Sequence, residues 1–126
     1  MATTVKQMLA DAEAVVPRIS AQEAVALHAK GDAVFIDLRE PPELTASGKV
    51  PGALAIPRGL LEFRADPEGA SRDPSLAAGK TVITYCASGG RAALAGRTLR
   101  ELGYGDVRNL GAFKDWVAAG GKVEPV

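Results

Sequence analysis

The chain has 126 residues, 47% of them hydrophobic and 24% charged, a composition typical of one folded domain. Its 15 basic and 15 acidic residues cancel, so we expect no nucleic-acid partner, and no apolar run is long enough to span a bilayer. The single cysteine, Cys86, and the single histidine, His28, exclude an internal disulfide and a Cys/His zinc site. Because the N-terminus lacks the apolar stretch of a secretion signal, we expect a cytoplasmic location, where Cys86 stays a thiol.

The first 31 residues carry two helical patterns. Apolar residues at helical spacing predict an amphipathic helix over 4–15, which either packs on the domain or serves an interface. "PRIS" at 17–20 reads as a short strand. Ser20 and Glu23 have the spacing of a capping box, so a second helix should begin after Ser20 and end at Gly31.

The middle of the chain alternates apolar runs with turn residues. "AVFIDL" at 33–38 predicts a buried parallel strand, and "PPEL" opens a short helix because proline suits the first turn. "VPGALAIP" at 50–57 predicts a turn and a short strand. Residues 58–79 are rich in proline, glycine and charge, which predicts mostly loop with one helical turn.

The last third holds the clearest strand. "KTVITYC" at 80–86 is β-branched and aromatic throughout, and the next apolar residues have helical spacing up to Gly103. A short strand at 106–110 and a short helix at 112–117 follow.

This alternation predicts an α/β fold with an open, mostly parallel sheet and helices on both faces. We expect an N-terminal extension over 1–16, one domain over 17–120 and a tail over 121–126.

Cys86 stands at the carboxyl end of the clearest strand, where open parallel sheets bind their ligands. Ala87, Ser88, Gly89 and Gly90 are small enough for a tight turn whose backbone N–H groups point inward as an anion nest. The following helix adds its positive N-terminal end, and Arg91 adds a fixed charge. Each effect favours a thiolate. Although a lone cysteine is more often inert packing, this context favours a nucleophile.

At this point the sequence resembles the rhodanese (sulfurtransferase) family, in its single-domain bacterial form. The resemblance covers about residues 17–119 and rests on several segments together. These are "CASGGRA", "IDLREPPEL", "GKVPGALAIP", "GYGDVRNLGAFKDW" and "PRGLLEFRADP".

The resemblance implies a rhodanese-like three-layer fold with a five-stranded sheet. It also implies that the Cys86 thiolate takes the outer sulfur of thiosulfate or a similar donor and carries it as a persulfide. Cyanide or a cellular thiol then removes this sulfur. The resemblance implies neither a metal nor an organic cofactor, and a protein donor or acceptor stays possible.

Loop length separates this chemistry from its relatives. Four residues lie between Cys86 and Arg91, whereas phosphatases and arsenate reductases that share the fold have five. The shorter loop suits a terminal sulfur better than a tetrahedral phosphoryl group. Lys49, Ala92 and Ala112 stand where many family members have histidine, serine and glycine, but the nucleophile and the loop glycines are intact.

Other charged residues have two interpretations. Arg91 either binds donor oxyanions or pairs with an acid such as Asp37. Asp37 and Arg39 end a central strand near the expected pocket, and a structural pair is favoured over substrate contact. Arg58 either guides an anion or is solvated. His28 and Trp116 are expected to pack rather than to catalyse.

Three alternative functions remain open. The first is a sulfur carrier that a partner protein loads or unloads at Cys86. The second is a non-enzymatic regulatory module, which has no need of a nucleophile. The third is a phosphatase, which the short loop disfavours.

Overall fold

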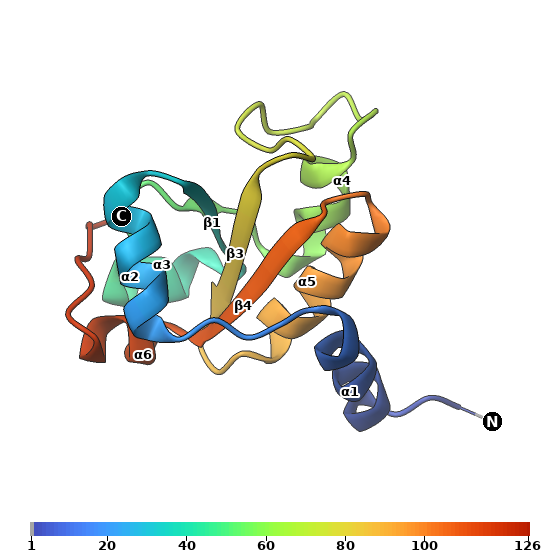
Figure 1. The fold of residues 1–126 in the computed structure, drawn as a ribbon, viewed down its shortest axis with the longest axis horizontal. Coiled ribbons are helices and arrows are strands. Elements are labelled where there is room, and N and C mark those ends of the chain that lie inside the picture. The colour runs from blue at the N-terminus through green and yellow to red at the C-terminus, as the bar shows by residue number, and fades with distance from the viewer. Residues whose placement is uncertain (1) are drawn as a thin grey trace.

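Four parallel strands form the sheet in the computed structural model, which describes residues 2–126. They are β1 (Ala33–Asp37), β2 (Leu54–Ala55), β3 (Thr81–Cys86) and β4 (Asp106–Ala112). Their order is β2-β1-β3-β4, so β1 and β3 are central and buried. The carboxyl ends of the strands lie at the lower edge of the sheet in Figure 1, where β3 leads into the next helix. The parallel α/β prediction is confirmed.

The predicted fifth strand is wrong in detail. Residues 17–20 contribute one isolated parallel bridge, between Arg18 and Asn109, rather than a strand. Proline at position 17 has no N–H for a ladder, and Ser20 already caps the following helix. Only two backbone hydrogen bonds therefore join this segment to β4, from Asn109 to Pro17 and from Ile19 to Asn109.

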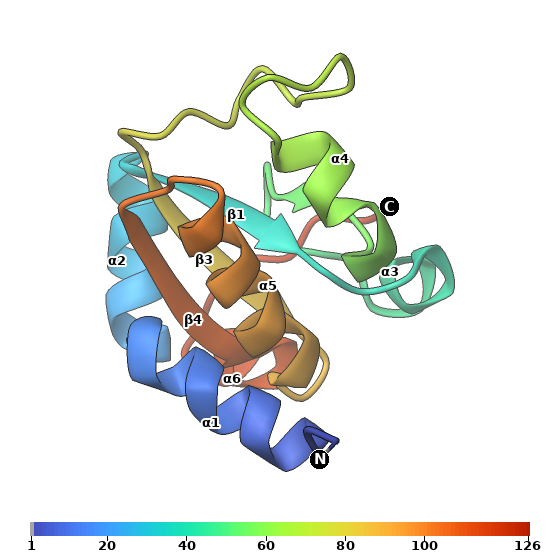
Figure 2. The same cartoon turned by 90° about the vertical axis from the view of Figure 1, so that its right-hand side faces the viewer.

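Helices cover both faces of the sheet, as Figure 2 shows with α2 on one side and α4 and α5 on the other. Their bounds are α1 Val5–Val15, α2 Ala21–Lys30, α3 Pro41–Ser47, α4 Leu61–Ala65, α5 Gly90–Glu101 and α6 Phe113–Ala118. A 3₁₀ turn over Arg58–Leu60 precedes α4, so residues 58–65 are more helical than predicted. Within residues 2–126 none of the helices has the length and apolar character needed to cross a bilayer.

Local sequence signals account for most of these boundaries. The Ser20 hydroxyl accepts from the Glu23 N–H at 3.1 Å, and the Glu23 carboxylate accepts from the Ser20 N–H at 3.3 Å. Gly31 ends α2 with φ +73°, a left-handed conformation that glycine adopts without strain. The capping box and the stop that the sequence predicts are both confirmed.

Two apolar clusters fill the space between the layers. One holds residues of β1, β3, α4 and α5 together with Cys86, and the other packs α2 and α6 against Phe35, Ile83 and Tyr85. The N-terminal helix α1 lies against α5, where Val16 meets Gly96 and Asp11 approaches Arg97 at 3.7 Å. Of the two alternatives for this helix, the structure shows packing on the domain.

Candidate functional site

The Cys86 side chain lies at the junction between the sheet and the helix that follows it. Cys86 is the last residue of β3, paired with Ala112 of β4, and its side chain is fully buried. Its Sγ accepts a hydrogen bond from the Gly89 N–H at 3.0 Å. The backbone therefore folds back over the sulfur, and the tight turn that the sequence predicts after Cys86 is present.

The loop between Cys86 and α5 depends on Gly89. This residue is the N-cap of α5 with φ +100°, where any other residue would be strained. A Cβ added there would also lie 3.4 Å from Gly111 Cα of β4. Ala87 and Ser88 are exposed at the tip of the loop, and Gly90 begins α5. The 12-residue helix thus directs its positive end at the loop.

Arg91 stands in the first turn of α5 and pairs with a carboxylate other than the one named from the sequence. Its two terminal nitrogens donate to the two oxygens of Glu43 in α3, at 2.7 and 3.0 Å. These hydrogen bonds raise the pKa of Arg91, and the Cys86 side chain is close enough to add to the rise. Arg91 therefore pairs directly with Glu43 in the first turn of the helix that follows the Cys86 loop.

Asp37 is not free to pair with Arg91 because Arg39 already holds it. Arg39 Nε and Nη2 donate to Asp37 at 2.9 and 2.7 Å, and both side chains are buried. The guanidinium also donates to Ser47 Oγ and Gly48 O, at 2.7 and 2.8 Å. It thereby ties the end of β1 to the end of α3, which is the structural alternative that the sequence favoured.

Arg58 lies over the side of α5 rather than at its beginning. Its guanidinium donates to Glu62 Oε1 at 2.9 Å and to Thr98 Oγ1 at 3.0 Å. Thr98 is two turns of helix beyond Gly90. The structure therefore does not bring Arg58 together with the Cys86 loop.

His28 and Trp116 pack together, away from Cys86. Their rings meet edge to face with centroids 5.3 Å apart, and His28 Nε2 lies 2.7 Å from Pro51 O. Lys49 donates to Ala53 O and approaches Glu124 at 3.5 Å. The contacts of His28, Trp116 and Lys49 therefore serve packing and the joining of neighbouring segments.

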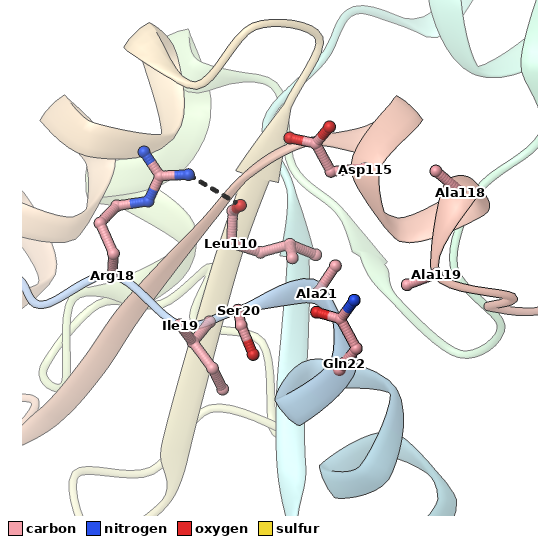
Figure 3. Close-up of a pocket in the computed structure, with 9 residues that line it drawn as sticks. All are labelled: Arg18, Ile19, Ser20, Ala21, Gln22, Leu110, Asp115, Ala118 and Ala119. Atoms are coloured by element: carbon pink, nitrogen blue, oxygen red, sulfur yellow. Dashed lines mark hydrogen bonds between the residues drawn. The ribbon is translucent and has the colours of Figure 1, made fainter.

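A hollow of about 350 Å³ lies between the start of α2, the end of β4 and α6, as Figure 3 shows. It is lined by Arg18, Ile19, Ser20, Ala21, Gln22, Leu110, Asp115, Ala118 and Ala119, and therefore not by Cys86. Arg18 extends along its wall and donates to Asn109 O and Leu110 O at 3.0 and 3.2 Å. We place the candidate site at Cys86 rather than in this hollow, which is lined by no nucleophilic thiol.

Glu43 is the residue that sequence reasoning missed. It lies within the segment "IDLREPPEL", but its position there is explained equally well by helix capping, and its carboxylate does accept from the Glu40 N–H at 2.9 Å. Its partner Arg91 is 48 residues further along the chain. No local pattern predicts such a pair.

Taken together, a parallel α/β sheet, a cysteine at a strand end and a glycine turn before a helix make up the candidate site. The family model for a rhodanese-like domain matches residues 20–119. The chain therefore belongs to the rhodanese-like domain family.

Relatives and solved structures agree with this assignment. The human thiosulfate:glutathione sulfurtransferase is 34% identical over 80% of this chain and 93% of its own. A sulfurtransferase from Allochromatium vinosum is 36% identical over 71% of this chain and 76% of its own. A Rhodopseudomonas palustris protein of unknown function, described as a possible tyrosine phosphatase, is 35% identical, with a TM-score of 0.89 over 98% of this chain and 96% of that one. The polysulfide-sulfur transferase homodimer of Wolinella succinogenes is 32% identical, with a TM-score of 0.74 over 96% of this chain and 87% of that one.

Proposed function

We propose that this chain is a sulfurtransferase that takes a sulfane sulfur from thiosulfate or a similar donor and carries it as a persulfide on Cys86. The observation that carries the proposal is the 3.0 Å hydrogen bond from the Gly89 N–H to Cys86 Sγ, at the positive end of α5. A thiolate is the nucleophile in sulfur chemistry, and a backbone donor together with the helix end stabilises it.

The reaction has two displacements. The Cys86 thiolate attacks the outer sulfur of thiosulfate, the S–S bond of the donor breaks, and its electron pair leaves with sulfite. A thiol or cyanide then attacks the terminal sulfur of the persulfide and regenerates the thiolate. The backbone N–H groups of the loop, Ala87, Ser88, Gly89 and Gly90, bind the negative charge of the donor and of the persulfide. Arg91 lies next to this loop in the first turn of α5, where both of its terminal nitrogens donate to Glu43.

Two names among the relatives support particular substrates. The human relative is named for thiosulfate as donor and glutathione as acceptor, so a small thiol is the acceptor we propose here. The Wolinella relative is named for polysulfide, which also offers a sulfane sulfur to a thiolate. Both donors are anions, and a small thiol can accept the sulfur after either.

A phosphatase is the second candidate because of the name of the Rhodopseudomonas relative. The loop argues against it, since four residues between Cys86 and Arg91 make a smaller pocket than the five of the phosphatase relatives.

The test is the intact mass of the purified chain before and after incubation with thiosulfate, beside Cys86→Ser and Cys86→Ala. A gain of one sulfur atom in the wild type alone, removed by cyanide or glutathione, is the expected result. No gain, with Cys86 reduced and alkylatable, would exclude thiosulfate and direct the same assay to polysulfide and then to a loaded partner protein. Cys86-dependent turnover of an aryl phosphate would support the phosphatase instead.

A further inference from the structure

The carboxylate of Glu43 accepts three hydrogen bonds, although it is partly exposed to solvent. Both of its oxygens accept from Arg91, and one also accepts from the Glu40 N–H that caps α3. The two side chains are only about one-third exposed, at 33% and 36%. The carboxylate is therefore held in one place at the rim of the Cys86 loop.

The charge of Glu43 is permanent under working conditions. The hydrogen bonds from Arg91, and after them the one from the Glu40 N–H, lower the pKa of Glu43 to about 2. The pair thus occupies two of the five N–H donors of Arg91 and cancels its charge. Arg39 and Asp37 cancel one another in the same way. The formal charges of the four side chains around the site sum to zero.

What remains positive at the loop is the backbone, namely its N–H groups and the N-terminal end of α5. These partial charges suit one negative charge better than two. A dianionic donor also meets the Glu43 carboxylate near the guanidinium that would otherwise bind its second charge. The site therefore discriminates by donor charge as well as by donor shape.

Resting on the proposed sulfurtransferase function, we propose that Glu43 is a specificity-determining residue that biases Cys86 toward donors with fewer negative charges than thiosulfate. Thiosulfate brings two charges to the loop and leaves as sulfite. A thiosulfonate brings one, and the same attack on its outer sulfur breaks the S–S bond and releases a sulfinate. The two donors differ mainly in one oxyanion replaced by a carbon substituent.

The experiment compares the rate of Cys86 persulfide formation from thiosulfate and from methanethiosulfonate, by rapid quench and intact mass at low ionic strength. Glu43→Gln removes the charge and keeps hydrogen-bonding groups, and Glu43→Ala removes both. The matched control is Asp106→Asn, because Asp106 binds Arg108 through both oxygens at 3.0 and 3.1 Å and is 44% exposed. Asp106 begins β4, at the end of the strands opposite to Cys86.

We expect both Glu43 variants to raise the ratio of the thiosulfate rate to the methanethiosulfonate rate. For two unit charges on the order of 7 Å apart, an effective dielectric constant of 20–80 corresponds to a change in rate of about 3- to 50-fold. The gain should shrink in high salt, whereas Asp106→Asn should leave the ratio at its wild-type value.

Three outcomes would overturn the inference. An unchanged ratio in both variants would show that the charge of Glu43 does not act on the donor. An equal loss with both donors would show that Glu43 only positions Arg91. If wild-type Cys86 accepted sulfur from neither donor, this inference would fail, and the proposed function would then depend on the polysulfide and partner-protein assays.

Discussion

Replacing Arg39 by methionine should destabilise the fold far more than it slows sulfur transfer. The side chain is 4% exposed and holds the carboxylate of Asp37, which is 0% exposed, together with Ser47 Oγ and Gly48 O. Its guanidinium carbon also lies 4.4 Å from the centroid of the Phe113 ring. Methionine restores part of the apolar contact and none of the hydrogen bonds.

The size of the effect follows from the charge that is left behind. Removing one partner of a buried ion pair costs about 3–5 kcal/mol because the other charge stays buried without compensation. A domain of this size is stable by roughly 5–15 kcal/mol, so Arg39→Met should still fold, with a clearly lower urea midpoint. The double variant Asp37→Asn/Arg39→Met no longer leaves a buried charge, and it should lose less than the two single losses combined.

The assay is urea unfolding followed by tryptophan fluorescence, with the persulfide rate measured on the folded variant. A loss below about 1 kcal/mol, together with a large fall in the persulfide rate, would refute the structural role. It would instead restore the alternative in which Arg39 binds the donor.

Two further predictions concern the pairing of α3 and α1 with α5. Because the folded-state pKa of Glu43 is about 2, below its ordinary 4.5, the Arg91 pair adds stability that is complete above about pH 4.5 and is lost as the pH falls through 2. Urea unfolding should therefore show wild type exceeding Glu43→Gln by more at pH 5.5 than at pH 2.5, and an equal gap would contradict this. Gly96→Ala places a Cβ 2.9 Å from Val16 Cγ1, so although alanine favours a helix, overpacking should give a net loss of about 1 kcal/mol and faster proteolysis of α1. If Gly96→Ala were more stable than wild type and α1 were equally resistant to proteolysis, Val16 would be able to move aside at no cost, and the prediction would be wrong.

The sequence predicts those parts of the site that depend on neighbouring residues. Cys86, the glycine turn and the start of α5 follow one another within a few positions. The strand pattern, the turn residues and the helical spacing can therefore all be recognised in one short segment. The capping box at Ser20 is local for the same reason. The parallel sheet follows because alternating strands and helices leave few other arrangements.

The contacts that the sequence could not predict join residues that are far apart along the chain. Arg91 could have paired with any acid that the fold brought near, and Asp37 was a reasonable partner by position. Its carboxylate is occupied because Arg39, only two residues away, turns back onto it. The prediction of a fifth strand was wrong for a different reason. Residues 17–20 pair with β4 through a single bridge at Arg18, and one bridge does not make a strand.

Three arginine–carboxylate pairs show why residue type alone does not give a role. Asp37–Arg39 is buried and binds two elements together, so its loss should act on stability. Glu43–Arg91 has the same chemistry but is half-buried beside the Cys86 loop, where we propose that the charge of Glu43 acts on an incoming anion. Arg108–Asp106 is about as exposed as that second pair, yet it lies at the amino end of β4, whereas Cys86 lies at the carboxyl end of the neighbouring strand β3. Burial decides whether such a pair supports the fold, and its position relative to the strand ends decides whether it can influence the reaction.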